Sequence, residues 1–132
     1  MPHTIAQHEG VLTVRLDGKI NANELMQDLK AQLEALKGSM VVLVDFALAS
    51  EISQPVKAAL YRLLQYGRVL KIGFCGVSQQ RQAELSDLFS LLARVRPIAV
   101  AMTEPEVRQK LGLAQPVGDR KLSGMLNYLR KA

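Results

Sequence analysis

Two short apolar runs dominate the hydrophobic pattern of this chain, residues 40–46 (MVVLVDF) and residues 69–77 (VLKIGFCGV). Apolar residues are nearly continuous within each run, which is typical of strands that are buried on both faces of a sheet. One helix-sized segment separates the runs, and parallel neighbouring strands need a crossover of about that size. The pattern therefore predicts two adjacent parallel strands with helices above and below them.

The rest of the pattern predicts three further strands and four helices. Alternating apolar residues on either side of Glu9-Gly10 predict a hairpin, and apolar residues at helical spacing predict the helices. Suitable N-caps are Asn21, Ser78 and Thr103. In chain order, the predicted elements are strands 5–8 and 11–16, helix 22–37, strand 40–46, loop 47–53, helix 55–67, strand 69–77, helix 78–94, strand 97–102 and helix 103–112. This β-β-α-β-α-β-α-β-α order predicts a single α/β domain with a mixed five-stranded sheet.

The composition changes after Leu113. Residues 114–118 predict a short linker, and residues 120–131 predict an extra C-terminal helix. Its apolar positions are Leu122, Met125, Leu126 and Leu129, and its other face carries Arg120, Lys121, Arg130 and Lys131. A helix this short is marginal in water, so its apolar face must pack on something. Three interpretations stay open: packing on the parent domain (residues 1–113), docking on a second copy or a protein partner, and contact with an acidic membrane surface. We expect the four apolar residues to contact a second copy or a partner.

Charge differs between the two halves of the chain. Residues 1–53 hold four basic and seven acidic side chains, and residues 54–132 hold thirteen basic and five acidic ones, for a net charge of +5. A basic half suits an acidic partner, nucleic acid, anionic lipid or the acidic half of another copy, and it is also compatible with an ordinary solvated surface. No recognition motif organises the arginines near Tyr61 and Tyr66, so we expect no nucleic-acid partner.

Cysteine usage and hydropathy suggest a cytoplasmic protein. Cys75 is the one cysteine in the sequence, and its place in an apolar run predicts a packed thiol. The longest apolar stretches are far shorter than the roughly 20 residues of a membrane-spanning helix. Residues 1–4 do not begin a secretory signal pattern. We therefore expect a cytoplasmic location.

Candidate chemistry gathers where the predicted parallel strands end, because ligands of open α/β sheets collect there. Asp45, Glu51 and Ser53 are the polar side chains expected near this edge. Two close carboxylates can form an acid–base pair. Equally, Asp45 can bind loop amides and Ser53 can cap the next helix. Ligand spacing for a metal is absent from the sequence, as are a dinucleotide motif and a motif linking Cys75 to a histidine. We therefore expect no metal, cofactor or catalytic residue.

Residues 4–112 resemble the STAS fold, and more closely its SpoIIAA-like branch. The resemblance rests on the segments 11–18 (VLTVRLDG), 41–46, 47–53, 69–77, 98–102 and 104–111. It implies a small regulatory or ligand-binding module rather than a catalyst. In the anti-sigma-factor antagonists of this superfamily, a serine in an Asp-Ser-Ser/Thr-Gly motif is phosphorylated to switch partner binding. The matching stretch here is Ile52-Ser53-Gln54-Pro55, which lacks the motif and leaves Ser53 as the nearest possible phospho-acceptor.

These observations lead to one principal functional hypothesis and two alternatives. The principal hypothesis is a non-catalytic STAS-like module that binds a protein partner and assembles with itself. Its expected contact surface comprises Asp45, Glu51, Ser53, Lys57 and Tyr61, together with the C-terminal helix. One alternative is a carrier or sensor of a small apolar or lipid-like ligand, to which the resemblance links the SpoIIAA-like branch. The other is a small enzyme that uses Asp45, Glu51 and Ser53.

Overall fold

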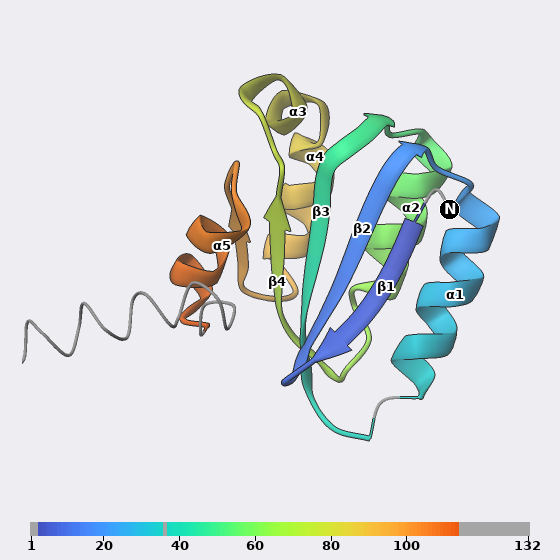
Figure 1. The fold of residues 1–132 in the computed structure, drawn as a ribbon, viewed down its shortest axis with the longest axis vertical. Helices are drawn as coiled ribbons and strands as arrows, with labels where there is room; N and C mark the ends of the chain where they lie inside the picture. The colour runs from blue at the N-terminus through green and yellow to red at the C-terminus, as the bar shows by residue number, and fades with distance from the viewer. Residues whose placement is uncertain (1–2, 36, 114–132) are drawn as a thin grey trace, which may run out of the picture.

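A computed structural model describes residues 3–35 and 37–113 of the chain (Figure 1). The predicted linker and C-terminal helix at 114–132, with their four apolar residues, lie outside the described residues. The strands are β1 (His3–His8), β2 (Val11–Lys19), β3 (Met40–Glu51), β4 (Val69–Cys75) and β5 (Ile98–Val100). The helices are α1 (Ala22–Glu34), α2 (Gln54–Leu63), α3 (Gln79–Glu84), α4 (Ser86–Ala93) and α5 (Glu104–Leu111).

The strands form one mixed sheet in the order β1-β2-β3-β4-β5. β1 is antiparallel to β2, and all the other neighbours are parallel. Val42 lies opposite Ile72, and Val44 lies opposite Phe74, so the two apolar runs are adjacent and parallel. The central prediction from the sequence is therefore confirmed, as is the α/β class with a five-stranded mixed sheet.

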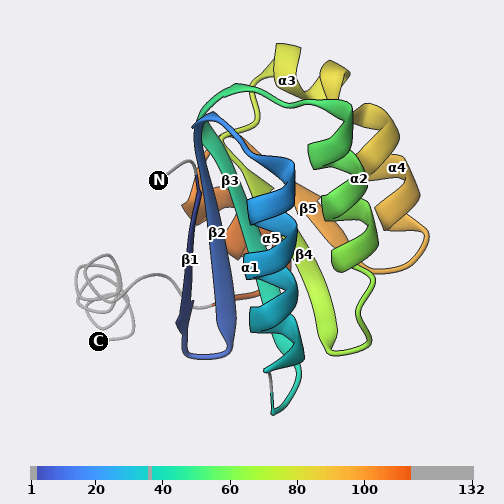
Figure 2. The same cartoon turned by 90° about the vertical axis from the view of Figure 1, so that its right-hand side faces the viewer.

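Helices cover the two faces of the sheet unequally. The crossovers that contain α1, α2 and α4 all pack on one face, as a constant handedness of parallel crossovers requires, and α5 lies on the other face (Figure 2). The larger apolar cluster fills the first face and includes Leu29, Phe46 and Phe74, all almost fully buried. A smaller cluster under α5 includes Leu43 and Val107.

Side-chain caps begin the helices where the sequence predicts them. Asn21 Oδ1 accepts a hydrogen bond from the backbone N–H of Glu24 at 3.1 Å, and Ser78 Oγ accepts one from Arg81 N–H at 3.2 Å. Thr103 Oγ1 accepts from the N–H of Glu106 at 3.4 Å. Each cap satisfies a backbone donor that has no partner inside its helix.

Strand β3 is longer than predicted. The polar loop expected at 47–53 is wrong for residues 47–51, which continue the strand to Glu51. β2 also extends beyond its predicted end, and Gly18 and Lys19 pair with Ala49 and Glu51 after a shift in register. This part of β3 passes beyond the end of β4, so it has one neighbouring strand and its side chains are largely exposed. The continuous apolar pattern that marks a central strand is therefore lost there.

The single helix predicted at 78–94 is also wrong, because the structure divides it into α3 and α4. The break is at Leu85, which has φ −102° and ψ 8° and a fully buried side chain. Periodicity does not reveal the break, since Leu85, Leu88 and Phe89 all face the core and fit one helical stripe.

Candidate functional site

Of the three residues that the sequence groups at the edge of the sheet, the structure separates Asp45 from Glu51 and Ser53. Asp45 and Glu51 both lie on β3, six residues apart, and a strand rises about 3.3 Å per residue. Their backbones are thus roughly 20 Å apart along the strand. Asp45 lies on the face that carries α5, and its Oδ1 accepts a hydrogen bond from the N–H of Ala47 at 2.9 Å. Asp45 therefore binds a backbone amide, one of the two roles that the sequence left open.

Ser53 occupies the N-cap of α2, and its Oγ accepts a hydrogen bond from the N–H of Val56 at 3.4 Å. Its side chain remains exposed, as does that of Glu51 two residues earlier. The hydroxyl is accessible at the positive end of the helix dipole. Within the described residues, neither a basic side chain nor a carboxylate forms a hydrogen bond with this hydroxyl. Its observed role is therefore the cap.

Asp45 belongs instead to an ionic network on the α5 side of the sheet. Arg15 lies directly across from Asp45 in the β2–β3 pairing. Its guanidinium is 3.8 Å from an oxygen of Asp45 and 3.8 Å from an oxygen of Glu104. Glu104 also forms a 2.8 Å ion pair with Arg108. Because the Arg15 side chain is 62% exposed, water screens these contacts and we assign the network little stability.

Cys75 lies beneath this network and is buried, as its apolar run predicts. Burial, followed by the nearby charges of Asp45 and Glu104, raises the pKa of the thiol to about 12. Its Sγ donates a weak hydrogen bond to the carbonyl of Val44 at 3.8 Å. A thiol with this pKa is protonated at neutral pH and is therefore a poor nucleophile.

Two of the predicted contact residues do come together. Lys57 and Tyr61 line one side of a groove between α2 and α4, and its volume is about 160 Å³. The remaining lining residues are Gln54, Ala58, Asp87, Leu88 and Leu91. Leu91 is 41% exposed and contributes apolar surface to the groove. Lys57 Nζ donates a 3.4 Å hydrogen bond to the carbonyl of Glu84, the last residue of α3.

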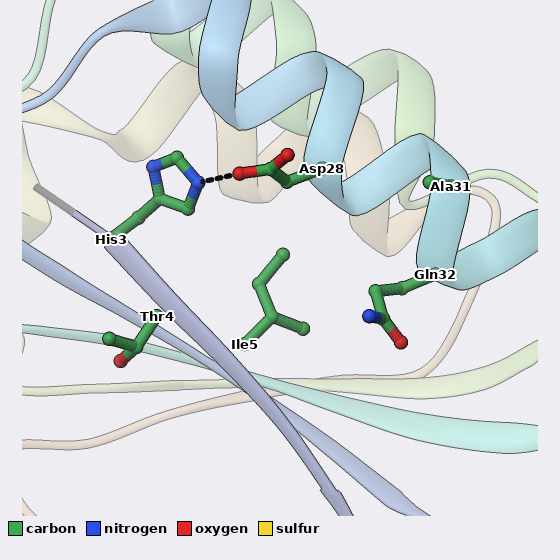
Figure 3. Close-up of a pocket in the computed structure, with 6 residues that line it drawn as sticks. All are labelled: His3, Thr4, Ile5, Asp28, Ala31 and Gln32. Atoms are coloured by element: carbon green, nitrogen blue, oxygen red, sulfur yellow. Dashed lines mark hydrogen bonds and ion pairs between the residues drawn. The ribbon is translucent and has the colours of Figure 1, made fainter. Parts of the chain in front are cut away.

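A second, larger depression lies between β1 and α1, with a volume of about 340 Å³. Figure 3 shows His3 and Asp28 directed toward each other above Ile5 and Gln32. His3 is buried, and its Nε2 lies 2.7 Å from Oδ2 of Asp28, while its Nδ1 has no hydrogen-bond partner within 3–35 and 37–113. This contact links the edge strand β1 to α1. Sequence reasoning missed it, because neither residue has a motif and only the fold brings them together.

The described residues also limit what the site can hold. Across 3–35 and 37–113, His, Cys, Asp and Glu side chains do not gather in any group of three or more suited to a metal ion. Within the same residues, every helix is too short or too polar to cross a bilayer.

Comparisons with known proteins agree with the fold. No family model matches the sequence, and no curated protein is significantly similar to it. A solved structure of an uncharacterised DUF3478-family protein from Shewanella loihica PV-4, described as having a SpoIIAA-like fold, matches with a TM-score of 0.58. The alignment covers 83% of this chain and 91% of that one at 14% sequence identity, a level at which the likeness concerns fold alone. The chain thus has the SpoIIAA-like α/β fold that the resemblance in its sequence implies.

Proposed function

We propose that this protein is a non-catalytic module that binds a protein partner through the groove between α2 and α4. The observation that carries this proposal is the convergence of Lys57 and Tyr61 with the apolar side chains of Leu88 and Leu91. An apolar floor with polar groups at its rim is the composition of a small protein-binding hot spot. Lys57 on one side and Asp87 on the other give the rim opposite charges that orient an incoming segment.

The size and charge of the groove define its occupant. Ligand pockets for drug-sized molecules usually enclose about 300–1,000 Å³, whereas this groove encloses about 160 Å³. It therefore suits one aliphatic side chain of a peptide segment better than a whole lipid. Arg62 on α2 and Arg94, the C-cap of α4, are exposed cations on or next to the two helices that form the groove. We accordingly propose a partner segment with one aliphatic anchor flanked by carboxylates.

A binding role is supported over a catalytic one by the separation of Asp45 from Glu51 and Ser53. Their groups do not approach a common point as acid–base chemistry requires. Ser53 acquires a different proposed role, because it lies one helical turn before Lys57. A phosphate on its exposed hydroxyl would add about −1.5 to −2 charge next to that lysine. Phosphorylation would thereby weaken binding of an acidic segment, and Glu51 lies at the same edge of this surface.

Matched surface variants test the proposal. Leu91→Asp places a charge in the groove, and Leu70→Asp is its control, because Leu70 is 50% exposed on β4 and does not line the groove. Lys57→Glu reverses a charge at the rim, with Lys30→Glu on the exposed face of α1 as its control. Proteins retained by the immobilised wild type from a native extract are identified by mass spectrometry, and the affinity of each purified candidate is then measured.

The proposal predicts a partner whose binding is lost with Leu91→Asp and Lys57→Glu and kept with both controls. It is contradicted when every retained protein binds all four variants equally well. It is also contradicted when the controls reduce binding as much as the groove variants do. Circular dichroism of each variant verifies that the fold is intact.

A further inference from the structure

The face of the sheet that carries α5 is only partly covered. α5 packs on β4 and β5. On this same face of the sheet, no helix among the described residues covers β1, β2 or the adjacent half of β3 (Figure 2). The outward side chains on this part are exposed at Thr4, Ala6 and Arg15 and half-buried at Thr13, whereas Val11 at the start of β2 is buried. We call this surface the open face. Sheets in layered α/β domains usually have both faces covered, so the open face lacks one helix.

The chain leaves the described structure beside the open face. α5 runs from Glu104, near Arg15, to Leu111, whose carbonyl accepts a 3.0 Å hydrogen bond from Nζ of Lys71 near the start of β4. Leu113 then packs against the smaller apolar cluster, which includes Val11 and Val41 at the beginning of β2 and β3. Leu113, the last described residue, therefore lies near the end of the sheet where these strands start.

The sequence that follows has the length of the missing helix. Residues 120–131 would form a helix of about 18 Å at 1.5 Å per residue, and β2 measures roughly 20 Å from Val11 to Asp17. Helices pack about 8–10 Å apart and strands about 4.8 Å apart, so one helix beside α5 covers β1 to β3. Residues 114–119 fall within the roughly 2–8 residues that commonly connect neighbouring helices.

We propose that residues 120–131 pack as a helix on the open face of their own domain, antiparallel to α5, which is the alternative to the contact with a second copy or partner expected from the sequence. Leu122, Met125, Leu126 and Leu129 share one side of this helix. They would lie on the small side chains of Thr4, Ala6 and Thr13, because large side chains above small ones fill the space between two layers. The antiparallel direction brings Arg130 and Lys131 to the end of the sheet that holds Asp45 and Glu104.

Charge supports the same occupant. β1, β2 and β3 with their turns carry Glu9, Asp17, Asp45 and Glu51 against Arg15 and Lys19. Residues 114–132 carry four cations against the single carboxylate of Asp119. The opposite net charges of the segment and the open face favour this contact. Contact between the segment and the rest of the second half, which is also basic, would be repulsive.

Paramagnetic broadening in the full chain tests the proposal. A nitroxide attached to Ser123→Cys lies beside the apolar stripe, and the native Cys75 is buried and stays unlabelled. The amides of Thr4, Ala6 and Thr13 should lose their NMR signal intensity, while amides of α2 on the opposite face should keep theirs. In a mixture of spin-labelled and isotope-labelled chains, no localised broadening should occur.

Each other result overturns the proposal. Broadening of the same amides in the mixed sample shows contact with a second copy, and broadening over α2 and α4 shows docking in the groove. Uniform or absent broadening shows that the segment does not occupy the open face. A matched pair of variants adds a second readout, because Leu126→Asp should abolish the localised broadening and Asn127→Asp, on the polar side of the predicted helix, should leave it.

Discussion

The close packing of α5 on β4 makes Gly73 a position where one methyl group should destabilise the protein. A Cβ at Gly73 would lie 2.5 Å from Cδ2 of Leu43 and 3.0 Å from Cδ1 of Leu111, and it would also collide with Cγ1 of Val107. These neighbours belong to β3 and α5, and all three are buried, so none can swing into solvent. Gly73→Ala therefore requires the buried side chains of Leu43 on β3 and of Val107 and Leu111 on α5 to repack.

Overpacking of a tight core costs about 1–3 kcal/mol, and three close contacts place this substitution in the upper part of that range, about 2–3 kcal/mol. For a domain of this size, each kcal/mol lowers Tm by roughly 4 °C, so Tm should fall by about 10 °C. Urea unfolding followed by circular dichroism measures the free energy of unfolding directly.

Gly67→Ala is the matched control, since a Cβ at Gly67 has no atom within 4 Å. It should leave stability unchanged or raise it by up to about 1 kcal/mol, because alanine restricts the unfolded chain. The double variant Gly73→Ala/Val107→Ala should lose less stability than the sum of the single variants, since the methyl that collides is removed. The reasoning is refuted when Gly73→Ala is as stable as Gly67→Ala.

Three further predictions follow from the contacts of single side chains. Asp28→Ala leaves both ring nitrogens of the buried His3 without partners and should cost about 1–3 kcal/mol in urea unfolding; an unchanged midpoint would contradict the observed contact. Ser53→Ala removes the cap of α2 and should cost about 1 kcal/mol, whereas Ser53→Asp, also a good N-cap, should cost little; equal losses in the two variants would argue against capping. The pKa of the Cys75 thiol is about 12 in the folded chain against an ordinary value of 9.0, so the unfolded chain loses this proton first as pH rises. The free energy of unfolding of the wild type should therefore fall relative to that of Cys75→Ala between pH 9 and about 12, and the gap between the two should stay constant below pH 9. Parallel pH profiles over the whole range would contradict the raised pKa.

The central architecture was predictable because its signals are local. Continuous apolar residues in β3 and β4 indicate strands with neighbours on both sides, and one helix between them indicates parallel pairing. Helix starts were predictable for the same reason, since Asn21 and Thr103 bind amides only three residues away.

The end of β3 and the break at Leu85 were not predictable from pattern. Residues 47–51 pair with β2 alone, so the apolar run stops where the strand does not. Leu85 continues the apolar stripe of α4, whose buried residues are Leu88, Phe89 and Leu92, so periodicity alone extends one helix across the break. Both features depend on tertiary neighbours that a single sequence does not identify.

In the candidate site, too, some contacts were predictable from the sequence and others were not. Lys57 and Tyr61 are four residues apart on one helix, so their shared face follows from helical spacing. The opposite wall, with Asp87 and Leu91, depends on how α4 packs against α2. The contact between His3 and Asp28 and the ion pair between Arg15 and Glu104 likewise form only when the sheet has assembled.

Photo-crosslinking from inside the groove tests the proposed function most directly. A photoreactive phenylalanine replaces Tyr61, which lines the groove, or Leu70, an exposed residue on β4, and each protein is irradiated in native extract. Partner binding at the groove predicts a discrete crosslinked protein from position 61 that is absent from position 70 and that disappears with Leu91→Asp. The same adducts from both positions, or an adduct from position 61 that survives Leu91→Asp, would contradict it.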